Sequence, residues 1–304
     1  TDPDLALDQY NLSRLFARRD RPAAAAARRR RAIALGFEGL DSDVAAGEEK
    51  DGREVERRAG HEAMRFSNYG LAATHYRTAL QFGNDAAGKR SLGLAYAMSR
   101  RYEKAAIAYE AALQLDPAMP EVYNDLAIVH SQGFEEHERA LGLLQKAVEL
   151  DPGEKLYLYN LAHIHYTLTQ FSQAAAGFAQ VLKLDASSAL NLLCLGMSEA
   201  RLGRTETAET HLRAALAINP KYADAQFELG KVYAAQGRQE EAREMLERCV
   251  ALKPTHKYAH YALGQTYLQL GQSREAQKVL TQFRGLHPHP KQEQLVFYAP
   301  LDTT

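Results

Sequence analysis

The chain has 304 residues, and its 37 basic and 38 acidic side chains leave a formal net charge of −1. Proteins that bind nucleic acid or an anionic membrane surface usually carry a basic excess, so this balance argues against both classes. No apolar run approaches the ~20 residues of a membrane-spanning helix, and two cysteines, Cys194 and Cys249, are too few for a disulfide framework. We therefore expect a soluble protein, cytoplasmic or periplasmic, with no membrane span and no nucleic acid as a partner.

The first 85 residues carry an irregular helical pattern. Residues 10–36, YNLSRLFARRDRPAAAAARRRRAIALG, combine alanines with apolar residues at helical spacing. The acidic stretch at 39–52, GLDSDVAAGEEKDG, contains glycines and has no periodicity, which predicts a loop or linker. Residues 68–84, NYGLAATHYRTALQFGN, again predict a helix.

From residue 86 to residue 290 the pattern becomes regular. The helical stretches end in prolines 34 or 35 residues apart, with Ala186 in the place of one of them: Pro117, Pro152, Pro220, Pro254 and Pro288. An early glycine recurs in four of the periods, at Gly93, Gly196, Gly230 and Gly264. An alanine leads the later stretch of every period: Ala105, Ala140, Ala174, Ala208, Ala242 and Ala276. This pattern predicts pairs of helices joined by a short turn, with small residues where the helix backbones approach closely.

The pattern L-G-x-x-Y…A-x-x-x-[FYL]-x-x-[AVC]…P at a period of 34 residues resembles the tetratricopeptide repeat. The resemblance implies an all-α fold, an α-solenoid in which helix-turn-helix hairpins form a right-handed superhelix. It divides the regular part into six repeats, at 86–119, 120–154, 155–188, 189–222, 223–256 and 257–290. The remaining segments are a degenerate N-terminal hairpin at 1–39, an acidic loop or linker at 40–52, a degenerate repeat at 53–85 and a C-terminal tail at 291–304.

The resemblance also implies where a partner would bind. In tetratricopeptide proteins the first helix of each repeat lines a concave groove, and at the matching positions this chain has mostly aromatic and apolar side chains. The predicted groove residues are Asn124, Asp125, Ile128, Tyr159, Asn160, His163, Tyr166, Leu193, Cys194, Met197, Phe227, Lys231, Tyr258, Tyr261 and Gln265. An open strip of this kind usually marks a partner site. The alternative is that these side chains pack against one another across a tight superhelix.

The sequence offers little for catalysis. It contains no phosphate-binding glycine loop, no H-E-x-x-H, no G-x-S-x-G and no paired C-x-x-C. We therefore predict a non-enzymatic scaffold, with no cofactor and no metal, that binds a peptide or amphipathic helix of another protein. Two alternatives stay open: an accessory region of a larger enzyme or secretion assembly, and a metal or small-ligand site built from His163, Cys194 and Met197.

The tail KQEQLVFYAPLDTT at 291–304 belongs to no repeat. It starts with polar residues, continues with four apolar residues from Leu295 to Tyr298, and then has Pro300, which prevents a long helix. We expect the tail to lie across the last repeat near Leu280 and Phe283, or to dock in the groove of a second molecule and cause self-association.

Overall fold

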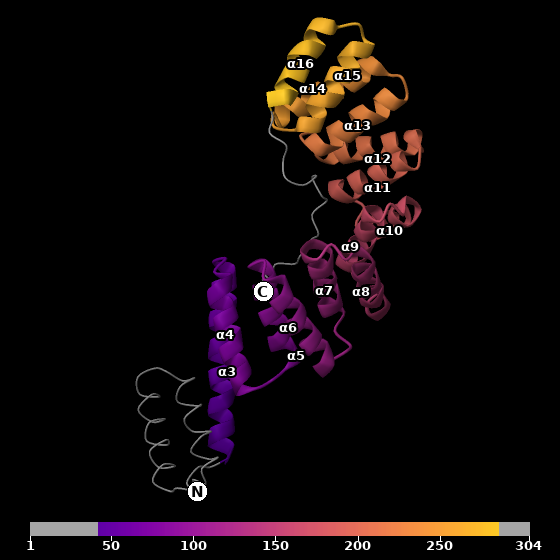
Figure 1. Cartoon of the computed structure of the whole chain (residues 1–304). Helices are drawn as coiled ribbons and strands as arrows, with labels where there is room; N and C mark the ends of the chain where they lie inside the picture. The colour runs from indigo at the N-terminus through magenta and orange to yellow at the C-terminus, as the bar shows by residue number, and fades with distance from the viewer. Residues whose placement is uncertain (1–41, 286–304) are drawn as a thin grey trace. The chain divides into compact units, whose positions relative to one another are not determined.

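The computed structural model describes residues 42–285, which contain helices and no strand (Figure 1). The predicted hairpin at 1–39 and the tail at 291–304 lie outside the described residues. The chain divides into two compact units, Thr1–Arg139 and Ala140–Thr304. Within the described residues the fold is an all-α solenoid, and this prediction is confirmed.

The described part of the first unit contains α3 (Ser42–Arg65), α4 (Tyr69–Phe82), α5 (Ala86–Met98), α6 (Tyr102–Leu115) and α7 (Pro120–Gly133). Helix α8 (His137–Leu150) begins just before the boundary and lies mostly in the second unit. The second unit continues with α9 (Lys155–Thr167), α10 (Phe171–Leu184), α11 (Ala189–Arg201), α12 (Thr205–Ile218), α13 (Ala223–Ala235), α14 (Gln239–Leu252), α15 (Lys257–Gln269) and α16 (Ser273–Gly285). From α9 to α16 each helix packs against the next, and α13 also touches α11 and α15.

Small residues allow the two helices of a hairpin to approach closely. A Cβ atom added at Gly230 would lie 2.7 Å from Cγ of Leu246, and one at Gly196 would lie 2.8 Å from Cγ of Leu212. The six alanines that lead the second helices are all 0% exposed: Ala105, Ala140, Ala174, Ala208, Ala242 and Ala276. The period found in the sequence is therefore a period of close helix contacts.

The turn within each hairpin needs one residue in the left-handed region of φ. Gly203, Gly237 and Gly271 supply it in the last three hairpins, with φ values of +77°, +77° and +74°. The earlier hairpins place other residues in the same conformation: Ser67, Arg100, Glu135 and Thr169. Several helices then begin with a side-chain cap, such as Ser188, whose Oγ accepts a hydrogen bond from the backbone N–H of Asn191 at 3.2 Å.

The structure differs from the predicted loop at 40–52, because helix α3 already begins at Ser42. The prediction treated glycine as a helix breaker, whereas here it permits close packing. A Cβ atom at Gly52 would lie 2.7 Å from the Phe82 ring on α4, and one at Gly60 would lie 2.6 Å from the Tyr76 ring. The other residues of 42–52 include alanine, glutamate and lysine, which favour helix.

Candidate functional site

Five of the predicted groove residues in the second unit are part of the packed core. Tyr159, Asn160, His163, Leu193 and Cys194 on α9 and α11 are each no more than 5% exposed. The Tyr159 ring lies 5.6 Å from the ring of Phe178 and its hydroxyl is 3.9 Å from Sγ of Cys194. For these residues the structure shows the alternative arrangement, in which first-helix side chains pack against one another.

Two predicted residues lie at the edge of this core. Tyr166 is half-buried, its ring lies 5.3 Å from that of Phe171, and burial raises the pKa of its hydroxyl. Met197 is also half-buried and packs against the core formed by α11, α12 and α13. Only part of each of these two side chains is therefore accessible to a partner.

The remaining predicted residues lie on α13 and α15, and together with Leu268 we call them the open face. Phe227 is half-buried, and the other members are exposed: Lys231, Tyr258, Tyr261, Gln265 and Leu268. Tyr258, Tyr261 and Leu268 are 55%, 48% and 46% exposed. The spacing of the four α15 residues places them on one side of the helix, and Phe227 and Lys231 are one turn apart on α13. The sequence prediction missed Leu268, although it occupies the same register in its repeat as Tyr166 does in its own.

Aromatic contacts fix the side chains of the open face at both ends. The Tyr261 ring lies 5.4 Å from the Phe283 ring on α16, and Nζ of Lys257 is 5.1 Å from the centre of that Phe283 ring. The Phe227 ring lies 4.6 Å from the ring of His256, which precedes α15. These contacts hold large apolar groups at the surface rather than folding them into the core.

The charge on the open face is largely compensated within the protein. Nζ of Lys231 donates to the Glu228 carboxylate at 2.8 Å and 3.1 Å, and it also lies 5.1 Å from the centre of the Phe227 ring. The open face therefore presents aromatic and aliphatic surface with little net charge.

The predicted residues of the first unit lie on α7. Asn124 and Asp125 are buried, and Ile128 is half-buried. The Asp125 carboxylate accepts a hydrogen bond from Nε of Arg90 on α5 at 3.0 Å. Asp125 thus forms an ion pair with a partly buried arginine of the neighbouring hairpin. Its role is therefore in the packing of the two hairpins.

Of the three residues predicted as a metal or small-ligand site, His163 and Cys194 are buried. Burial raises the pKa of the Cys194 thiol to about 12, so the thiol stays protonated and is a poor nucleophile or metal ligand. Within residues 42–285 no group of three or more His, Cys, Asp or Glu side chains is arranged to hold a metal ion. The predicted site at His163, Cys194 and Met197 has no support from this chemistry.

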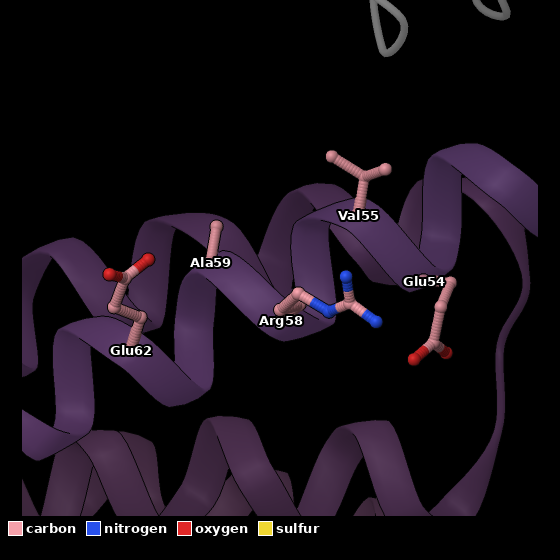
Figure 2. Close-up of a pocket in the computed structure, with 5 residues that line it drawn as sticks. All are labelled: Glu54, Val55, Arg58, Ala59 and Glu62. Carbon is pink, nitrogen blue, oxygen red and sulfur yellow. The ribbon is translucent and has the colours of Figure 1, made fainter.

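A shallow hollow lies along α3 in the first unit. Figure 2 shows its lining residues, Glu54, Val55, Arg58, Ala59 and Glu62, projecting from that helix. They contribute two carboxylates and a guanidinium but no nucleophile, and a site on one side of a single helix encloses little of a ligand. Among the helices of the described part, none is both long and apolar enough to cross a membrane.

Sequence profiles of the tetratricopeptide repeat match residues 86–118, 185–255 and 236–295. A human protein named FK506-binding protein-like is 39% identical to this chain over 95 residues. The match covers 31% of this chain and 27% of that protein. The chain thus spans about a quarter of the length of this relative.

Solved structures show the same fold. A tetratricopeptide repeat protein from Parabacteroides merdae superimposes with a TM-score of 0.64, over 79% of this chain and 95% of that one, at 15% identity. YrrB, a TPR protein with an unusual peptide-binding site, superimposes with a TM-score of 0.55, over 62% of this chain and 96% of that one, at 23% identity.

Proposed function

Because the chain belongs to the tetratricopeptide repeat family, we propose that it is a non-enzymatic scaffold that binds a segment of another protein on the open face. The observation that carries this proposal is the exposure of Tyr258 and Tyr261, at 55% and 48%, on the same side of α15 as the exposed Leu268. Exposed clusters of this kind are typical of sites where proteins bind partners.

The chemistry of the open face indicates the kind of segment that would bind. Tyrosine rings provide contact area with few rotatable bonds, and their hydroxyl groups accept and donate hydrogen bonds. Gln265 adds an amide, while Lys231 is already paired with Glu228. We expect a peptide or amphipathic helix with aromatic or aliphatic side chains and little net charge.

The first test selects peptides from a random displayed library on the full chain and measures their affinity by calorimetry. Tyr258→Ala combined with Tyr261→Ala should weaken binding at least about tenfold, because truncating buried aromatic anchors commonly costs more than ~1 kcal/mol each. Phe66→Ala is the control, since Phe66 is 78% exposed but lies directly after α3, outside the open face. Equal binding by the double variant, with its helical circular dichroism intact, would contradict the proposal.

A second candidate function is that the repeats are an accessory region of a larger protein. The support is that the human relative is much longer than the part that matches this chain. The match covers 27% of that relative's length. In that case the open face would bind a segment within the same assembly rather than a separate partner. Size measurement of the native protein isolated from its source would separate the two.

A further inference from the structure

We propose that the protein segment bound on the open face carries acidic residues on both sides of its apolar part, and that Arg201 and Lys257 bind their carboxylates. The apolar contact rests on the proposed function, whereas the charge of the flanking residues follows from two basic side chains outside the open face. The residues of the segment that contact the open face itself remain aromatic or aliphatic.

Arg201 and Lys257 lie on the first helices of the repeats before and after that of α13. Arg201 is the last residue of α11, and Lys257 is the first residue of α15. Helix α13, which carries Phe227 and Lys231 of the open face, contacts both α11 and α15. A segment that lies across these three helices therefore meets both cations.

The guanidinium of Arg201 is held by aromatic side chains. Its Cζ lies 4.7 Å from the centre of the Phe171 ring, and the guanidinium donates a hydrogen bond to the Tyr166 hydroxyl. Burial raises the pKa of that hydroxyl, the charge of Glu228 on α13 raises it further, and Arg201 lowers it. These groups thus lie close together at the border of α11 and α13, and the Arg201 side chain is exposed there.

Lys257 is held in a similar way at the start of α15. Its Nζ lies 5.1 Å from the centre of the Phe283 ring, and that ring lies 5.4 Å from the Tyr261 ring of the open face. Helix α15 has no acidic residue in its first turn, where the helix dipole places a partial positive charge. The lysine and the helix end therefore both attract a negative group to the edge of the open face.

Neither cation has a carboxylate partner among the described residues. No ion pair within residues 42–285 includes Arg201 or Lys257. By contrast, every lysine and arginine within α12, α13 and α14 pairs with a carboxylate at 3.1 Å or less: Arg213, Lys231, Arg243 and Arg248. Two cations without a carboxylate beside an apolar surface indicate that the partner supplies the negative charge.

Contact with an aromatic ring lowers the cost of binding an anion through these side chains. A long basic side chain loses rotamer freedom when it forms an ion pair. A side chain that already lies against a ring has less freedom to lose, so more of the attraction contributes to affinity. The carboxylates of aspartate and glutamate are the peptide groups that pair best with a guanidinium and an ammonium.

Two displayed peptide libraries test the sign of the charge on the partner. Both have the same random core, but one carries glutamates on both sides of the core and the other carries lysines. Each library is selected on the full chain, and calorimetry measures the affinity of its best binders. We expect the glutamate-flanked binders to be at least about tenfold tighter, because like charges across an interface repel.

Charge variants then locate the contact, with the best glutamate-flanked peptide as the probe. Arg201→Gln combined with Lys257→Gln should weaken its binding about five- to tenfold, as expected for two exposed ion pairs. The same variant should reduce the effect of added NaCl on the affinity. Arg274→Gln combined with Lys278→Gln is the matched control and should change the affinity less than about twofold. It removes the same charge from exposed side chains of α16 that point away from Phe283 and have no ion pair or ring contact among the described residues.

Equal affinities from the two libraries, equal losses in the two charge variants, or no binder from either library would each overturn the proposal. The proposed function is tested separately by Tyr258→Ala with Tyr261→Ala. If binders from both libraries have equal affinity and lose it in this tyrosine variant, the proposed function stands and the acidic flanks do not. If the tyrosine variant binds the glutamate-flanked peptide unchanged while Arg201→Gln with Lys257→Gln weakens it, the cation contacts stand and the open face does not.

Discussion

At the scale of single residues, the turn inside each hairpin shows how one backbone angle affects stability. Thr169 adopts φ +59°, where the later hairpins have glycine. The left-handed conformation costs an L-residue about 1–2 kcal/mol, and β-branched residues are especially rare there. The same fold is therefore built from turns of unequal strain.

Thr169→Gly should stabilise the protein by about 0.5–1 kcal/mol, because relief of the φ strain exceeds the extra backbone entropy that glycine loses on folding. Urea unfolding followed by circular dichroism measures the change. Gly203→Ala is the matched control and should destabilise, since no atom lies within 4 Å of the added Cβ and only φ +77° is changed. A destabilised Thr169→Gly variant would show that the threonine side chain makes a contact worth more than the strain.

His130 on α7 makes stability depend on pH. Burial lowers the pKa of His130, partly opposed by the Glu136 carboxylate, which accepts a hydrogen bond from Nδ1 at 2.8 Å. Arg139 also lowers this pKa, and Glu110 raises it slightly. The Nε2 atom is buried and has no hydrogen-bond partner among the residues described, so protonation would leave a buried N–H unpaired.

A histidine with a lowered pKa stabilises the fold fully above its unfolded pKa of about 6.5, and this contribution is lost as the pH falls toward the folded pKa. His130→Tyr places the residue found at the same position in other repeats, Tyr96 and Tyr233. We expect the melting temperature of the wild type to fall more between pH 7 and pH 5 than that of the variant. Equal falls would mean that His130 does not control the acid sensitivity.

At the scale of the elements, the contact between the two helices of a hairpin depends on glycine. Gly230→Ala should destabilise by about 1–3 kcal/mol through overpacking, because its Cβ would lie 2.7 Å from Cγ of Leu246 and 3.3 Å from the Ala242 carbonyl oxygen. Gly142→Ala on α8 is the control: nothing lies within 4 Å of its Cβ, and helix propensity predicts a gain of about 1 kcal/mol. Equal effects of the two substitutions in thermal unfolding would refute the close contact at Gly230.

The hairpin period could be predicted from the sequence because it is carried by residues with a strict steric role. Only a small side chain fits where the two helices of a hairpin touch. The spacing of the small residues at these positions therefore predicts the helix pairs: the six leading alanines, Gly196, Gly230 and Gly264. The same reasoning failed at Gly52, because a glycine that breaks a helix and one that packs against Phe82 look alike in sequence.

The burial of the predicted groove could not be read from the sequence. Tyr159 and Tyr261 occupy the same register of their first helices, yet Tyr159 is 5% exposed and Tyr261 is 48% exposed. Tyr159 packs against Phe178 and Cys194 from adjoining helices, whereas Tyr261 lies in the last described hairpin. Exposure thus depends on the neighbours that the stack supplies, and a pattern within one repeat does not contain that information.

At the scale of the whole molecule, the described repeats of the second unit differ in how far their first helices are covered. Most aromatic side chains of the described first helices between α9 and α13 are buried or half-buried, and the exposed pair Tyr258 and Tyr261 comes at the end of the series. This arrangement is the basis for the proposal that a protein segment binds on α13 and α15.

The most direct test of the binding proposal is a map of the bound peptide on the full chain. Backbone amide resonances of the labelled protein would be recorded with and without a library-selected peptide. We predict that the largest shifts fall on residues 227–231 and 258–268 of α13 and α15, while α10 and α12 change little. Largest shifts on α10, on α12 or in the first unit, with α13 and α15 unchanged, would contradict the account.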